Sequence, residues 1–169
     1  VEEALDIVRP IAALKGVSIR MEIPDPTISL QTDPLKLRQI LVNLVTNAVK
    51  YTDVGSVVLI VRVEGLGTAL TVFFEVTDTG RGVATADHEH IFEAFWQAAH
   101  PLRRESDGTG LGLAVARQLA RLLGGDVVIA QSELGHGSTF IASLPAQCPG
   151  GTFTQTERRR STSAGTPRE

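Results

Sequence analysis

The chain has 169 residues, of which 43% are hydrophobic and 21% are charged, and its formal net charge is −3. A chain of this length suits one domain and can bury a core without a disulfide or a metal staple. Its single cysteine, Cys148, excludes a disulfide framework within the chain and a cysteine-based zinc cluster. The mildly acidic balance argues against broad contact with a nucleic-acid backbone. No apolar run approaches the roughly 20 residues that a membrane span needs.

The first half of the chain predicts a helix, a strand, a second helix and a hairpin. Residues 1–15 have helical spacing, and because this pattern starts at Val1 we expect the chain to be part of a longer protein. Apolar residues alternate over 17–23, which is typical of a strand. A second helix is predicted from the Thr32-Asp33-Pro34 start signal to Tyr51. The β-rich runs 56–64 and 69–77 flank a glycine-containing turn, which favours antiparallel neighbours.

The second half combines one long irregular stretch with a helix and two strands. Residues 78–110 have no sustained period, and a loop of that length inside a compact domain is usually functional. A helix is predicted over 111–123, and strands over 126–130 and 138–144. Residues 146–169 are predicted to be a disordered tail. The fold class is therefore α+β, with an open, mostly antiparallel sheet covered on one face.

A polar stripe runs along the second predicted helix, beside a broad apolar stripe. Its members are Gln39, Asn43, Asn47 and Lys50. The alternative is an ordinary amphipathic helix with a solvated face. Two asparagines are unusual choices for such a face because Asn is a poor helix former. A carboxamide oxygen is a neutral hard ligand suited to Mg²⁺, which binds together with phosphate oxygens.

Two glycine-rich segments carry further signals. Asp78-Thr79-Gly80-Arg81-Gly82 follows a strand, so a flat ligand can approach the backbone while the carboxylate accepts a hydrogen bond from an exocyclic amine; a plain tight turn is the alternative. Gly108–Leu113 leads into a helix, whose N-terminus favours a phosphate; the alternative is a flexible loop. This second segment fits neither the dinucleotide fingerprint nor the P-loop.

Taken together and in order, these stretches resemble the catalytic ATP-binding domain of two-component sensor histidine kinases, a branch of the GHKL ATPase superfamily. The family's N box is similar to residues 33–52, its first glycine box to 78–83, its F box to 91–97 and its second glycine box to 108–113. The resemblance implies a two-layer α/β sandwich of the Bergerat type over residues 1–145.

The resemblance also implies a role for each matching residue. Asn47 is expected to hold Mg²⁺, with Asn43 beside it, and Asp78 to accept from the adenine amino group of ATP. The lid is expected to span 96–109 and to be anchored to the core by Phe92 and Phe95. The other expected ATP-binding residues are Lys50, Tyr51, Gly80, Gly82, Val83, Arg103, Arg104, Gly108, Thr109, Gly110, Leu111, Gly112, Leu113 and, through a water, Thr139.

One position bears on the mechanism. Superfamily members that hydrolyse ATP carry a Glu where this chain has Asn43, and an amide cannot accept a proton at neutral pH. The site is therefore expected to orient ATP for a histidine nucleophile rather than to hydrolyse it quickly. His88, His90, His100 and His136 do not match the family's phosphoacceptor.

The resemblance also implies the partners of the domain and its location in the cell. The acceptor histidine is expected on a dimerisation domain outside this chain, and the phosphoryl group is expected to pass to a response-regulator receiver domain. This domain is expected to be monomeric and cytoplasmic, without nucleic-acid or membrane contact, although its parent could be membrane-anchored. The alternatives are a regulatory nucleotide-binding module without phosphotransfer, a serine/threonine kinase or hydrolytic ATPase of the same superfamily, and a structural protein that binds no nucleotide.

Overall fold

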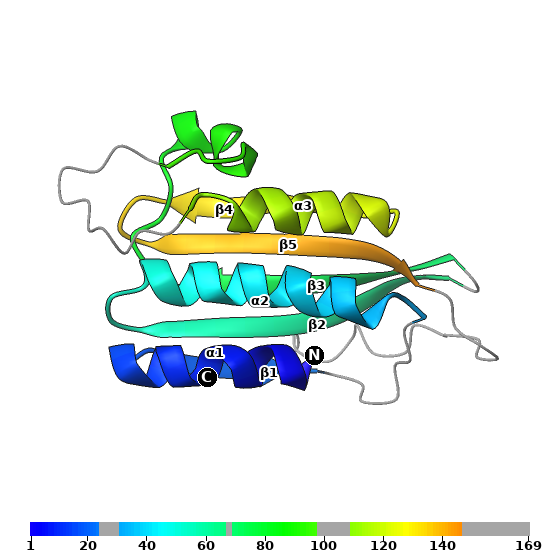
Figure 1. Cartoon of the computed structure of the whole chain (residues 1–169), viewed down its shortest axis with the longest axis horizontal. Coiled ribbons are helices and arrows are strands. Elements are labelled where there is room, and N and C mark those ends of the chain that lie inside the picture. The colour runs from blue at the N-terminus through cyan, green and yellow to red at the C-terminus, as the bar shows by residue number, and fades with distance from the viewer. Residues whose placement is uncertain (24–30, 67–68, 98–108, 147–169) are drawn as a thin grey trace, which may run out of the picture.

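A five-stranded sheet carries three helices on one face (Figure 1). The computed structural model describes residues 1–23, 31–66, 69–97 and 109–146. Within them the elements are α1 (Glu2–Lys15), β1 (Ser18–Glu22), α2 (Pro34–Tyr51), β2 (Ser56–Leu66), β3 (Ala69–Asp78), the 3₁₀ turns η1 (Thr85–Asp87) and η2 (His90–Phe92), α3 (Gly112–Leu122), β4 (Asp126–Glu133) and β5 (Gly137–Ala146). The predicted α+β class is confirmed. The predicted tail lies outside the described residues, apart from Ala146, which ends β5.

The strand order is β1-β2-β3-β5-β4, with β1 parallel to β2 and the remaining pairs antiparallel. The predicted hairpin between β2 and β3 is confirmed by this pairing. At the end of β3, Asp78 lies opposite both Val57 on β2 and Ser138 on β5. Residues that pair directly on neighbouring strands point to the same face of a sheet, so Asp78 and Ser138 share a face. Since side chains alternate along a strand, this is also the face of the buried Val76, which the helices cover.

The core lies between this covered face and the helices. Leu41, Leu44 and Val45 of α2 are fully buried, as are Leu59 and Val76 of the two central strands they face. Burying an aliphatic side chain of this size contributes roughly 2 kcal/mol. The apolar stripe of α2 is thereby fixed against the sheet, and the polar stripe on its flank cannot turn inward.

Both ends of α2 are capped, which fixes the helix that carries the polar stripe. At its start the Asp33 carboxylate accepts hydrogen bonds from the backbone N–H groups of Leu35 and Lys36 at 3.0 and 3.1 Å. Asp33, rather than Thr32, is therefore the cap. At its end Lys15 of α1 donates its Nζ to the carbonyl oxygens of Val49 and Lys50, at 2.9 and 2.7 Å. These carbonyls would otherwise lack a helical partner.

The main differences from the prediction lie in β4 and in the long irregular stretch. β4 continues to Glu133 instead of ending at residue 130, because an irregularity between Ile129 and Gln131 restores its pairing with β5. The described part of the long irregular stretch contains two short 3₁₀ turns, η1 and η2. Neither turn is long enough to show a period in the sequence.

Candidate functional site

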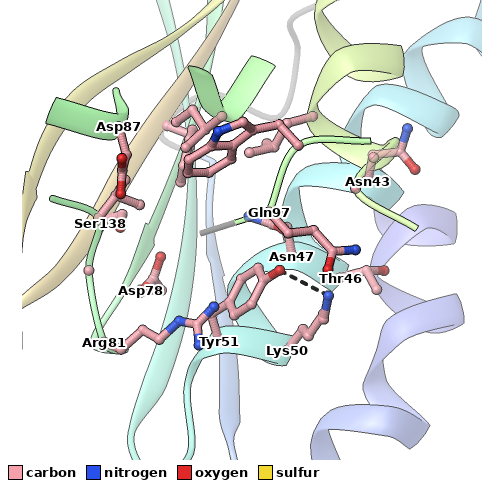
Figure 2. A pocket seen from close by; sticks show the side chains of 18 of the residues that line it. Asn43, Thr46, Asn47, Lys50, Tyr51, Asp78, Arg81, Asp87, Gln97 and Ser138 are labelled. Atoms are coloured by element: carbon pink, nitrogen blue, oxygen red, sulfur yellow. Dashed lines mark hydrogen bonds between the residues drawn. The ribbon is translucent and has the colours of Figure 1, made fainter. Parts of the chain in front are cut away.

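A cleft of about 680 Å³ opens between α2, the segment after β3, the segment after η2 and the start of α3. Glycine-containing segments line it together with polar groups of α2. In Figure 2 the side chains of Asn43, Thr46 and Lys50 lie on one side of the cleft, and those of Asp78, Asp87 and Ser138 lie on the other. The residues of the cleft are Val42, Asn43, Thr46, Asn47, Lys50, Tyr51, Asp78, Arg81, Gly82, Val83, Ala84, Asp87, Ile91, Trp96, Gln97, Thr109, Gly110, Gly112, Leu113, Leu134, Ser138 and Phe140.

Three of the four residues of the polar stripe of α2 form one wall of this cleft, whereas Gln39 does not line it. Asn43, Asn47 and Lys50 all line it, together with Tyr51 in the last turn. The Asn43 Oδ1 atom accepts a hydrogen bond from Gln39 Nε2 at 3.0 Å, and Lys50 Nζ donates to the Tyr51 hydroxyl at 2.9 Å. Two amides and an ammonium on one wall form a surface suited to a metal–phosphate unit.

Asp78 lies at the bottom of the cleft and is only 5% exposed. Burial raises the pKa of its carboxyl group, and hydrogen bonds from the backbone N–H groups of Gly80 and Ser138 oppose that rise. The bond from Gly80 is 2.8 Å long. A buried acceptor held in this way is arranged to receive a hydrogen bond from a ligand group, which is the role expected for it toward an adenine amine.

The glycines that follow Asp78 are required by close backbone contacts. Gly82 has a φ of +69°, and a Cβ added there would lie 2.0 Å from the carbonyl oxygen of Glu133. The next residue, Val83, donates its backbone N–H to Ser132 Oγ at 2.7 Å, and Ser132 also hydrogen-bonds Ser138. The segment after β3 is therefore held tightly against the β4–β5 hairpin.

The start of α3 forms the opposite wall and is more open. Gly110 accepts a hydrogen bond from the backbone N–H of Phe95 at 3.1 Å. A Cβ added at Gly110 would lie 2.7 Å from the Trp96 carbonyl oxygen, whereas one added at Gly112, the first residue of α3, would have no atom of the described residues within 4 Å. Thr109 and Leu113 also line the cleft, whereas Leu111 does not. An open helix N-terminus beside backbone N–H groups is suited to phosphate.

The two expected lid anchors, Phe92 and Phe95, differ in their packing. Phe92 packs edge-on against Phe140, with the ring centroids 6.5 Å apart, and fits the expected anchoring role. Phe95 does not, since it is 73% exposed and its φ of 66° lies in the left-handed region. Trp96 lines the cleft and stacks on His90, whose pKa is raised by the hydrogen bond with Glu93.

Some expected site residues are placed elsewhere. The structure does not bring Thr139 to the cleft: its hydroxyl lies 3.0 Å from that of Thr77 on the other face of the sheet, and its neighbour Ser138 faces Asp78 instead. Gly80 does not line the cleft but supports Asp78 through its N–H. Arg103, Arg104 and Gly108 lie outside the described residues, as does most of the expected lid.

Sequence analysis missed several residues that line the cleft. The polar or aromatic members without a predicted role of their own are Thr46, Arg81, Asp87, Trp96, Gln97, Ser138 and Phe140, of which Trp96 and Gln97 fall in the predicted F box. Thr46 precedes Asn47, and Arg81 lies between two glycines that were selected. Their neighbours were the available signal, but the sequence alone does not give the direction of a side chain in a loop.

The described residues contain neither a carboxylate–histidine metal cluster nor a membrane-spanning helix. Within residues 1–23, 31–66, 69–97 and 109–146, no group of three His, Cys, Asp or Glu side chains could hold a metal ion. A metal on this wall would therefore rely on amide and phosphate oxygens. In that same part of the chain, no helix is both long and apolar enough to cross a bilayer.

The fold and the cleft together define an ATP-binding domain of the GHKL class. Residues 32–147 match the model of the family described as histidine kinase-, DNA gyrase B-, and HSP90-like ATPase. The chain belongs to this family, and its resemblance to the catalytic ATP-binding domain of histidine kinases is confirmed by its relatives.

Those relatives are sensor kinases much longer than this chain. Autoinducer 2 sensor kinase/phosphatase LuxQ of Vibrio harveyi is 40% identical over 146 residues, which cover 84% of this chain and 17% of LuxQ. Sensor histidine kinase RcsC of Salmonella typhimurium is 38% identical over 122 residues, which cover 72% of this chain and 12% of RcsC. The chain thus spans less than a fifth of either relative.

Two solved structures have the same fold. Full-length ShkA in complex with AMPPNP superposes with a TM-score of 0.73 at 36% identity, over 87% of this chain and 29% of that one. The mycobacterial sensor histidine kinase MprB gives a TM-score of 0.70 at 21% identity, over 86% of this chain and 93% of that one. The second likeness concerns the fold alone.

Proposed function

We propose that this chain binds ATP with Mg²⁺ in the cleft and presents the γ-phosphoryl group to a histidine on another domain. The observation that carries the proposal is the juxtaposition of the amide wall of α2 with the buried acceptor Asp78 and the open start of α3. The proposal is supported by the similarity to ShkA, whose structure is a complex with AMPPNP, and by the relatives LuxQ and RcsC, which are sensor kinases.

The residues present fit Mg²⁺ and a nucleotide. Asn47 and Asn43 would offer amide oxygens to the metal, which neutralises phosphate charge when bound. Asp78 would accept the adenine amino group, and Gly82 would let the base lie against the backbone. Backbone N–H groups at the start of α3 would face the phosphates, and the open space beside Gly112 would give them room.

In the proposed reaction this domain positions ATP and supplies no nucleophile. An imidazole nitrogen of the partner histidine forms the new P–N bond, the bond from the γ-phosphorus to the bridging oxygen breaks, and ADP leaves while the imidazole loses its proton. The phosphoryl group then passes to a response-regulator aspartate. Catalysis by the domain comes from orientation and charge neutralisation. The domain itself is proposed to be monomeric and to work in the cytoplasm.

A phosphotransfer assay tests this function. The chain is mixed with radiolabelled ATP, Mg²⁺ and a histidine-bearing dimerisation domain of a sensor kinase, and label on that domain is counted. We expect transfer that is lost in Asn47→Ala. Nucleotide binding without any transfer would instead favour the regulatory-module alternative.

The role of Asn43 has a separate test. The variant Asn43→Glu restores a carboxylate one helical turn before Asn47, where it could activate water. We expect faster ATP hydrolysis than in the unaltered chain, measured as phosphate release, with Asn43→Gln as the uncharged control. Equal hydrolysis in both variants would contradict the account of this position.

A further inference from the structure

Arg81 is a cation in the cleft to which nothing above assigns a role. It lies between Gly80 and Gly82 in the segment after β3, and its side chain lines the cleft (Figure 2). Among the ion pairs of the described part of the chain, none includes Arg81. A guanidinium group that has no ion pair among the described residues attracts an anion more strongly in a cleft than it would in open solvent.

The backbone of Arg81 is held from both sides. Its N–H donates to the carbonyl oxygen of Tyr51 at 3.1 Å, and its own carbonyl oxygen accepts from Gly135 N–H at 2.8 Å. The first bond ties it to the end of α2, and the second ties it to the β4–β5 turn. The backbone of Arg81 is therefore fixed between the end of α2 and the β4–β5 turn, and its side chain extends from there.

The side chain of Arg81 is held as well. Its Cζ lies 4.2 Å from the centroid of the Tyr51 ring, a cation–π distance. Lys50 Nζ lies 4.5 Å from the same centroid and bonds the Tyr51 hydroxyl. In Figure 2 the Tyr51 ring is drawn between the two cations. A guanidinium stacked in this way has already lost much of its rotamer freedom, so little more is lost on binding.

This cationic unit lies between the two ends of the proposed nucleotide site. Tyr51 is one helical turn beyond the proposed metal ligand Asn47, on the same side of α2. The glycine segment that leads from Asp78 comes against the Tyr51 carbonyl, 2.3 Å from a Cβ added at Gly80. A nucleotide with its base at Asp78 and its metal at Asn47 would carry its sugar and first phosphates past Tyr51.

We propose that Arg81, stacked on Tyr51, faces the sugar-proximal phosphates of the bound nucleotide and makes the cleft select nucleotides over nucleosides. The inference rests on the proposed function, because it assumes a nucleotide in this cleft. Arg81 is then a specificity-determining residue, whereas Tyr51 is a positioning residue that acts through it. Its contribution is electrostatic and adds to that of Lys50.

Titrations of adenosine and of ADP with Mg²⁺ test this, with the fluorescence of Trp96, the chain's single tryptophan, as the signal. We expect Arg81→Ala to weaken ADP binding about 5- to 10-fold, as for one lost charge-assisted contact, and to leave adenosine within about twofold. Arg81→Lys should recover part of the loss, since an ammonium keeps the charge without the planar stack. Tyr51→Leu should weaken ADP binding more when it is made in the unaltered chain than when it is made in the Arg81→Ala variant.

The matched control is Arg20→Ala, which removes one exposed positive charge from β1, outside the cleft. Its ADP affinity and the salt dependence of that affinity should equal those of the unaltered chain, while Arg81→Ala should show a shallower salt dependence. Unchanged ADP binding and salt dependence in Arg81→Ala would overturn the inference, as would equal losses for adenosine and ADP. If the unaltered chain bound no ADP at all, the proposed function itself would fail.

Discussion

The two glycine-bearing walls of the cleft are built differently. In the wall after β3, residues 78–83, the protein's own backbone leaves no room for a side chain: an added Cβ at Gly82 would strike the Glu133 carbonyl oxygen. In the wall at the start of α3, residues 109–113, a Cβ added at Gly110 would lie 2.7 Å from the Trp96 carbonyl oxygen, but one added at Gly112 would meet no atom of the described residues. The first wall needs glycine in order to fold. In the second wall Gly110 is required in the same way, whereas Gly112 keeps a space that no other described residue fills.

The largest expected effect is on the first wall. Gly82→Ala would place a Cβ 2.0 Å from Glu133 O at a φ of +69°, so the backbone must shift. We expect a loss of about 3 kcal/mol or more in the free energy of unfolding, measured by urea titration. The control is Gly135→Ala, which has a similar φ of +81° but open space. It should lose only about 1–2 kcal/mol from the left-handed backbone. Equal losses would mean that close contact plays no part.

The second wall should respond in function rather than in stability. Gly112→Ala adds a methyl group in open space at the first residue of α3, so the free energy of unfolding should stay within about 0.5 kcal/mol or rise slightly. If phosphates approach the N–H groups there, AMPPNP affinity should fall about tenfold while adenosine affinity stays the same, as measured by calorimetry. Unchanged AMPPNP affinity would show that Gly112 only begins a helix.

A smaller effect concerns what holds α3 in place. Arg117 and Arg121 of α3 both bind Asp126 at the start of β4, at 3.0 and 3.1 Å, and Arg117 also stacks on Phe92. Burial acts to raise the pKa of Asp126, but the hydrogen bonds from the two arginines outweigh it and hold that pKa at about 2. The stabilisation is therefore complete above the unfolded pKa near 4 and is lost as pH falls from about 4 to about 2.

The variant Asp126→Asn measures this contribution. Because the Asp126 side chain is 35% exposed, solvent screening reduces the expected loss at pH 7 to about 1 kcal/mol in the free energy of unfolding. The difference from the unaltered chain should shrink toward zero near pH 2. Asp6→Asn breaks an exposed pair with Arg9 and should change stability by no more than about 0.5 kcal/mol. A loss that persisted undiminished at pH 2 would contradict the ion-pair explanation.

The regular elements could be predicted because each has a local cause. Asp33 and Pro34 mark the start of α2, alternation marks β1, and β-rich runs on either side of a glycine-containing turn mark β2 and β3. The polar stripe of α2 was also readable, and Asn43, Asn47 and Lys50 all line the cleft. A helix has a fixed period, so its sequence alone gives the direction of each side chain.

The features of the site that could not be predicted depend on loop geometry and on contacts between segments far apart in the sequence. Thr139 and Ser138 differ by one position, and only the pairing of Asp78 with Ser138 decides which of them faces the cleft. Arg81 meets Tyr51, 30 residues earlier, because the glycine segment packs on the end of α2. Phe95 points outward at a positive φ that its sequence does not indicate. Loop geometry of this kind has no period to read.

The most direct test is a calorimetric titration of ADP with Mg²⁺ into the unaltered chain and into Asp78→Asn. We expect binding in the micromolar range for the first and at least about 30-fold weaker binding for the second, because the amide cannot present the same pair of acceptor oxygens to the adenine amine. The melting temperature of Asp78→Asn should not fall by more than a few degrees. Burial raises the pKa of Asp78, so removing its charge relieves a cost at neutral pH that offsets the lost acceptor. Equal ADP binding by both proteins, or none by the folded unaltered chain, would contradict the account.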